Sequence, residues 1–136
     1  MTRTRFHTSA LLLALSFAGA VADAAPADLL AGYVATARGA QPAFAPSAVR
    51  GREFFTSRHG SDWSCSTCHT QDPATEGRHA TTQRAIAPLS PLANPRRFTD
   101  EARVEKWFGR NCRDVVGRAC TAAEKADVLA WLAGAR

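Results

Sequence analysis

The sequence predicts an all-α protein made of short helices joined by long loops, and three observations support this fold class. With 136 residues and a 46% hydrophobic content, the chain is long enough for one small domain. Helix-capping residues precede apolar residues at helical spacing, most clearly where the capping box Thr121 to Glu124 leads into an apolar stripe. That stripe contains Val128, Leu129, Trp131 and Leu132. No segment shows the alternation typical of a strand.

Four helices are expected, over residues 28–38, 47–59, 99–111 and 121–134. Asp28, Ser47 and Thr99 are the expected N-caps of the first three, and Gly39 and Gly60 should end the first two. The stretch from Gln71 to Phe98 contains four prolines and has no sustained period. So long an irregular segment is unusual in a small domain unless it surrounds something that is not protein.

The first 24 residues have the pattern of a secretory signal peptide. Arg3 and Arg5 form a basic start, and an apolar segment over residues 10–20 is too short to span a bilayer. Ala22 to Ala24 is a typical cleavage site. We therefore expect cleavage after Ala24, which leaves residues 25–136 as a single exported domain in the periplasm, where disulfides can form. A retained N-terminal anchor helix is the alternative, and no later segment is expected to span a membrane.

The charge pattern gives no sign of nucleic-acid binding. The net charge is +5, and the arginines are spread along the chain without a basic run. A basic surface favours an acidic protein partner instead.

The segment Cys65-Ser66-Thr67-Cys68-His69 is a C-x-x-C-H motif, the attachment signal of c-type haem. Two thiols add to the two haem vinyl groups, and the adjacent His69 is placed to bind the iron. A thioredoxin-type site would need a βαβ setting, which is absent. A zinc site would need a second pair of ligands at suitable spacing. A Cys65–Cys68 disulfide would leave His69 without a role.

The sixth iron ligand is not methionine, because Met1 is the only methionine and is lost with the signal peptide. His59 and His79 are candidates for a second histidine ligand. Asn111 is a further candidate, since it continues the helical stripe of Val104, Trp107 and Phe108 and should face inward. As an alternative, Asn111 caps the end of that helix. The pattern leaves both roles open.

Cys112 and Cys120 are expected to form a disulfide, because both belong to the exported part of the chain. Such a bond would fix the residue next to Asn111 and tie that helix to the last one. Its short loop limits its contribution to about 2–3 kcal/mol.

Several segments together resemble the monohaem cytochromes of the sphaeroides haem protein family, over about Val49 to Gly134. The shared segments are Asn94 to Asp100, Lys106 to Phe108, Arg110 to Cys112 and Gly117 to Thr121. The resemblance implies a class I cytochrome c fold with one haem c, ligated by His69 and Asn111, and a Cys112–Cys120 disulfide beside the second ligand.

The same resemblance implies a function. The asparagine leaves the iron on reduction, and the reduced haem then binds oxygen or nitric oxide. The implied redox partners are a dihaem cytochrome c and a membrane cytochrome b of the b561 type. Trp107 and Phe108 are expected to line the distal side of the haem, and Phe54 and Trp63 to pack against it.

Two other functions stay open at this point. One is an enzyme that turns over oxygen, nitric oxide or a peroxide, although no distal acid–base pair is evident. The other is a closed electron carrier with two histidine ligands.

Overall fold

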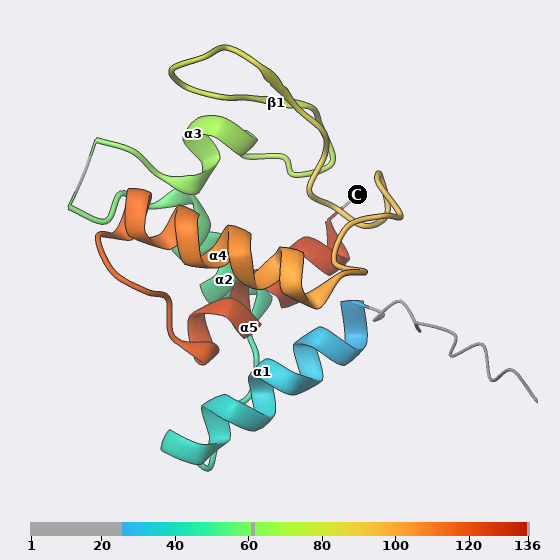
Figure 1. Cartoon of the computed structure of the whole chain (residues 1–136). Helices are drawn as coiled ribbons and strands as arrows, with labels where there is room; N and C mark the ends of the chain where they lie inside the picture. Colours follow the sequence, from blue (N-terminus) through green and yellow to red (C-terminus); the bar gives the residue numbers. More distant parts are fainter. Residues whose placement is uncertain (1–25, 61, 136) are drawn as a thin grey trace, which may run out of the picture.

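The computed structural model describes residues 26–60 and 62–135, so the predicted signal peptide over residues 1–24 lies outside the described residues. The described chain is helical apart from one small hairpin (Figure 1). Its elements are α1 (Pro26–Ala40), α2 (Ala48–Thr56), α3 (Cys65–His69), β1 (Gly77–Arg78), β2 (Ala85–Ile86), α4 (Glu101–Val116) and α5 (Ala122–Gly134).

Helices α2 and α5 pack closely and form the centre of the molecule. Phe55 of α2 joins Val128 and Leu132 of α5 in one buried cluster. Gly51 makes this contact possible, because a Cβ atom there would lie 1.9 Å from the Asp127 carbonyl oxygen. The glycine therefore allows the two backbones to touch.

A charged group reinforces the same helix pair. The Asp127 carboxylate is 9% exposed and accepts from the Ser47 backbone N–H at 2.6 Å and from Arg50 Nε at 2.7 Å. Arg50 Nη2 donates at 2.8 Å to Oδ1, the carboxylate oxygen that also accepts from Ser47. The buried charge is thus fully paired, as a buried carboxylate must be.

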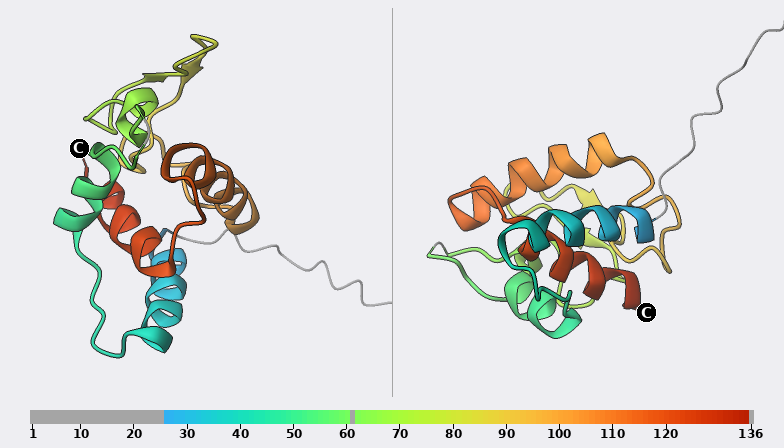
Figure 2. Two further views of the ribbon diagram at one scale, coloured as in Figure 1. Left: turned by 90° about the vertical axis from the view of Figure 1, so that its left-hand side faces the viewer. Right: turned by 90° about the horizontal axis from the view of Figure 1, so that it is seen from below.

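Helix α1 lies across α5 and completes the core (Figure 2). Ala37 and Phe44 pack against Ala126 in one cluster. Leu29 packs against Leu129 and against Val104 of α4 in another. Because α4 meets this second cluster, α1 contacts the helix that carries Asn111.

The helix bounds differ from the expected ones in several places. The first helix begins at Pro26, so Asp28 lies within its first turn and is not its N-cap. The first helix includes Gly39, because the Gln41 N–H bonds to the Ala37 carbonyl and continues the helix to Ala40. The second ends at Thr56, where Ser57 turns to extended backbone. The N-cap of α4 is Asp100, whose side chain accepts from the Arg103 N–H.

The expected irregular segment contains a short antiparallel hairpin, in which Gly77 pairs with Ile86 and Arg78 with Ala85. Two-residue strands are too short to leave an alternating pattern in a sequence. Arg97 fixes the following loop by donating to the Pro88 carbonyl at 2.7 Å and to the Ala87 carbonyl. In the part of the chain that the structure describes, no helix has the length and apolar character that a membrane crossing requires.

Candidate haem site

Helix α3 presents the two cysteines of the motif on a single turn. Ser64 precedes it in extended backbone, and the Ser64 N–H donates to the Thr67 hydroxyl at 3.0 Å. Residues three apart on a helix lie on one side, so Cys65 and Cys68 can reach the same group. His69 is the last residue of α3, directly beside them.

The two thiols have different surroundings. Cys65 packs against the cluster of Phe55, Val128 and Leu132, and burial raises the pKa of its thiol to about 11. The Cys68 sulfur accepts a hydrogen bond from the Ala80 N–H at 3.3 Å. Both cysteines are free and half-buried.

His69 is a neutral imidazole in this environment. Burial, with a smaller contribution from the Arg97 charge, lowers its pKa to about 4. Its ring lies 6.1 Å from that of Phe55, centroid to centroid. Across residues 26–60 and 62–135, no group makes a hydrogen bond to this ring. The imidazole therefore has an available nitrogen in the protonation state that a metal requires.

The hairpin packs directly on the motif. A Cβ atom at Gly77 would lie 2.2 Å from the Cys68 carbonyl oxygen and 3.0 Å from the His69 Cα atom. Only glycine fits this close approach of two backbones. Sequence reasoning missed Gly77, because a single glycine in a loop gives no signal of what it touches.

Asn111 lies within α4 rather than at its end. The helix continues to Val116, so the interpretation of Asn111 as a terminal cap is wrong. Its spacing places Asn111 on the same face as Val104 and Phe108, which pack into the core. The side chain is half-buried and makes no hydrogen bond to any residue that the structure describes. Its amide oxygen is therefore available as a metal ligand.

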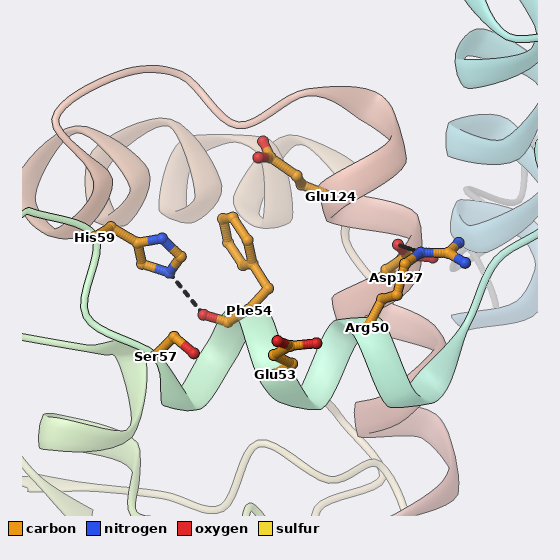
Figure 3. Close-up of a pocket in the computed structure, with 7 residues that line it drawn as sticks. All are labelled: Arg50, Glu53, Phe54, Ser57, His59, Glu124 and Asp127. Carbon is orange, nitrogen blue, oxygen red and sulfur yellow. Dashed lines mark hydrogen bonds and ion pairs between the residues drawn. The ribbon is translucent and has the colours of Figure 1, made fainter.

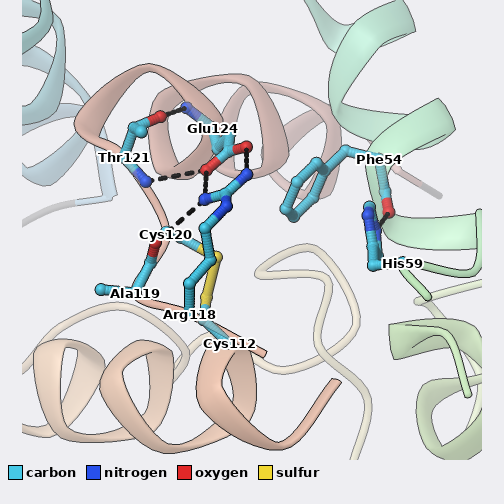
Figure 4. Close-up of polar contacts among 8 residues, drawn as sticks. All are labelled: Phe54, His59, Cys112, Arg118, Ala119, Cys120, Thr121 and Glu124. Carbon is cyan, nitrogen blue, oxygen red and sulfur yellow. Dashed lines mark hydrogen bonds and ion pairs between the residues drawn. A yellow bond between two sulfur atoms is a disulfide. The ribbon is translucent and has the colours of Figure 1, made fainter. Parts of the chain in front are cut away.

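The neighbouring Cys112 is buried and joined to Cys120 (Figure 4), with 1.95 Å between the sulfurs and 5.6 Å between the Cα atoms. The connecting loop turns at Gly117, which has a φ of 76°. Arg118 pairs with Glu124 at 2.6 Å. The hydrogen bond from Arg118 lowers the pKa of Glu124, and this effect is larger than the opposing effect of burial. The disulfide and this ion pair tie the end of α4 to the start of α5.

The two candidate histidine ligands are engaged elsewhere. His59 lies in a pocket at the junction of α2 and α5, where its Nε2 is hydrogen-bonded to the Phe54 carbonyl oxygen at 2.7 Å (Figure 3). His79 lies at the tip of the hairpin, and its Nδ1 accepts from the Thr82 N–H at 3.1 Å. Two of the three acidic residues that line the pocket, Asp127 and Glu124, are paired with arginines.

The four aromatic residues expected at the haem fall into two groups. Phe54 and Phe108 pack against the cluster that also contacts Cys65. Trp63 is 40% exposed and Trp107 47% exposed, and the Arg110 guanidinium lies over the Trp107 ring. Their contact with haem stays a prediction.

The chemistry of the donors fits haem c. Two thiols on one helical turn match the two vinyl groups, and an adjacent neutral imidazole supplies an axial nitrogen. The Asn111 amide oxygen on α4 is of the type that can act as a weak second donor. An all-α fold with such donors defines a c-type cytochrome.

Comparisons with known proteins agree. Residues 41–132 match the family model described as Domain of unknown function (DUF1924). The chain is 52% identical, over 96% of its length and 98% of the relative's, to the cytochrome c-type protein SHP of Cereibacter sphaeroides. It is 38% identical, over 85% of its length and 84% of the relative's, to cytochrome c'' of Methylophilus methylotrophus. The chain belongs to the family of SHP, and it carries covalently attached haem c.

Solved structures show the same fold. The structure of oxidised SHP, titled an oxygen-binding cytochrome c, has a TM-score of 0.74 at 51% identity, with 82% of this chain and 97% of that chain covered. Oxidised cytochrome c'' from Methylophilus methylotrophus has a TM-score of 0.76 at 35% identity, with 82% and 94% covered.

Proposed function

We propose that this protein is a periplasmic cytochrome whose reduced haem binds a small diatomic ligand at a position that Asn111 holds in the ferric state. In this proposal Cys65 and Cys68 form the thioether bonds, and His69 is the permanent axial ligand. The observation that carries it is the half-buried Asn111 amide, which has no hydrogen-bond partner among the described residues and lies on the inner face of α4. The relative SHP is described as oxygen-binding, which supports the same function here.

The choice of donor explains why the site would open on reduction. A neutral amide oxygen is a hard ligand that suits ferric iron better than the softer ferrous iron. Haem iron, when present, supplies the redox change and the binding of the gas. The chain supplies a ligand that leaves easily and returns, because the Cys112–Cys120 disulfide holds the adjacent residue in place.

The spectrum of the holoprotein tests this proposal. We expect Asn111→Ala to change the ferric absorption spectrum, because the sixth ligand is lost, while the reduced wild type binds carbon monoxide at once. Asn94→Ala is the matched control, because its side chain donates only to the Pro88 carbonyl at 3.4 Å in the loop. An unchanged ferric spectrum in Asn111→Ala would reject the ligand assignment.

Two alternatives have their own tests. A closed carrier with two histidines requires that His79→Ala or His59→Ala abolish the low-spin spectrum, whereas our proposal expects no change. An enzyme requires product formation from oxygen, nitric oxide or peroxide under turnover. One nitrogen of each imidazole is hydrogen-bonded to backbone, His59 Nε2 to the Phe54 carbonyl oxygen and His79 Nδ1 to the Thr82 N–H, so the variants decide between the candidates.

We further propose that electrons come from a dihaem cytochrome c and a membrane cytochrome b of the b561 type. Without Arg3, Arg5 and Asp23 the exported chain would carry a net charge of +4, which should speed association with an acidic partner, so the reduction rate should fall as salt rises. A reduction rate independent of salt would contradict the electrostatic part.

Removal of residues 1–24 on export is part of the same proposal, and mass spectrometry of the periplasmic protein should give Ala25 as its first residue.

A further inference from the structure

Three side chains from three helices meet beside the inner face of α4. The Tyr33 hydroxyl of α1 donates to Glu105 Oε1 of α4 at 2.6 Å. The Lys125 ammonium of α5 donates to both carboxylate oxygens, at 3.0 and 2.7 Å. We call Tyr33, Glu105 and Lys125 the α4 clamp. Glu105 is the member on the helix that carries Asn111, six residues before it.

The clamp also contacts Phe108, which lies one turn before Asn111. The Tyr33 ring meets the Phe108 ring edge-on, with centroids 6.0 Å apart. The Lys125 ammonium lies 5.3 Å from the Tyr33 ring centre and 5.7 Å from that of Phe108. Residues 108 and 111 are neighbours on a helix face. Restraint at Phe108 therefore restrains the backbone that presents Asn111.

The clamp is charged and partly shielded from water. The Lys125 side chain is 16% exposed, and that of Glu105 is 44% exposed. Burial opposes ionisation of Glu105, but hydrogen bonds from Lys125 and Tyr33 outweigh it and lower its pKa. Burial and the Glu105 hydrogen bond raise the pKa of Tyr33, which therefore remains a donor.

Asn111 thus lies between two restraints on α4. The clamp and Phe108 hold the side toward the start of the helix, and the Cys112–Cys120 disulfide holds the side toward its end. Between Phe108 and Asn111 stands Gly109, a residue that weakens a helix interior relative to alanine. The restraints on either side of Asn111 therefore contribute to its position.

From this arrangement we infer that Tyr33, Glu105 and Lys125 are positioning residues that determine how completely Asn111 occupies the sixth position of the ferric iron. The inference rests on the proposed function. It gives α1 a role in the site, although α1 precedes residues 41–132, which match the family model. Loosening the clamp should let α4 shift, so that Asn111 leaves more easily and external ligands enter faster.

The test compares holoprotein variants by three measurements: the ferric absorption spectrum, with Asn111→Ala as the reference for haem without this ligand, the rate of carbon monoxide binding after reduction, and amide hydrogen exchange in α4. We expect Glu105→Gln to raise the ratio of ferric protein without bound Asn111 to ferric protein with it by about three- to tenfold, the change that one lost hydrogen bond produces. Tyr33→Phe, which removes one hydroxyl, should shift it in the same direction by a smaller factor. Exchange of the amides around Phe108 should quicken in both.

Asp114→Asn is the matched control. It removes the same charge from the same helix, but Asp114 faces solvent and pairs only with Arg110, at 3.6 Å. If Glu105→Gln lowers the melting temperature yet matches Asp114→Asn in ferric spectrum and carbon monoxide rate, the clamp is structural only and the inference is wrong. If Glu105→Gln does not fold, Tyr33→Phe decides the question by the same readouts.

The outcome for Asn111 is separable. An unchanged ferric spectrum in Asn111→Ala would reject the proposed ligand, and with it this role of the clamp. A changed spectrum in Asn111→Ala together with unchanged Tyr33→Phe and Glu105→Gln spectra would reject the clamp alone.

Discussion

Gly51 of α2 lies against the backbone of Asp127 in α5, so close that a Cβ atom would be 1.9 Å from one carbonyl oxygen and 2.8 Å from the Val128 nitrogen. The obstructing atoms are backbone, which cannot move aside as a flexible side chain can. Cys65 packs against Phe55 and Val128 of this helix pair. The pair can pack this closely only because residue 51 has no side chain.

Gly51→Ala should therefore be strongly destabilising. We expect a loss of about 3 kcal/mol or more in the free energy of unfolding, at the upper end of overpacking effects. Gly32→Ala is the control, because nothing lies within 4 Å of a Cβ atom there and alanine favours a helix. Equal stability of the two variants in denaturant titrations would contradict the close contact.

Arg50→Met should destabilise the protein by about 1.5–3 kcal/mol, the usual contribution of hydrogen bonds to a charged group. It leaves the buried Asp127 carboxylate with the Ser47 N–H as its remaining donor among the contacts described. Arg103→Met should cost less than about 1 kcal/mol, because its ion pair with Asp100 spans 3.6 Å on the surface. Thermal unfolding of both variants measures the difference.

Stability should fall in acid in a way that depends on Glu105. Its pKa is lowered by Lys125 and Tyr33 in the folded state, against an ordinary value of 4.5. A lowered folded pKa stabilises the protein above that value, and the contribution is lost as the pH falls below 4.5 through the folded pKa. Glu105→Gln should show a smaller loss between neutral pH and this range. A parallel pH profile in wild type and variant would contradict this.

Replacing both Cys112 and Cys120 by alanine should lower the free energy of unfolding by about 2–3 kcal/mol, given the short loop. Haem should remain covalently bound, since neither residue belongs to the C-x-x-C-H motif. By contrast, Cys65→Ala with Cys68→Ala should release the haem under denaturing conditions. Haem staining of denaturing gels distinguishes the two double variants.

Much of the fold could be predicted because its signals are local. The capping box from Thr121 to Glu124 is present, with the Thr121 hydroxyl accepting from the Glu124 N–H at 3.2 Å. Ser47 caps α2 as expected. At α4, adjacent Thr99 and Asp100 compete, and Thr99 donates to the Arg96 carbonyl instead. Competition between two good N-caps is settled by surroundings that a sequence does not show.

For the haem site, the sequence predicts the attachment motif but not the surroundings of Asn111. The motif from Cys65 to His69 is contiguous, so its spacing alone indicates the chemistry. Periodicity predicts that Asn111 lies on the inner face of its helix. It does not predict that the helix continues beyond Asn111, because α4 ends at Gly117, whose positive φ stops it. The clamp gave no signal, since Tyr33, Glu105 and Lys125 are far apart in the chain and each is an ordinary helix residue.

The pairing of Arg50 with Asp127 joins residues 77 positions apart. Long-range contacts of this kind form late in folding, because a large loop must close before they can stabilise anything. A nascent chain in which α5 has not yet been synthesised cannot complete this core. Until α5 is present, the cluster of Phe55, Val128 and Leu132 that Cys65 packs against cannot form. A chain truncated before α5 should accordingly show no cooperative unfolding transition.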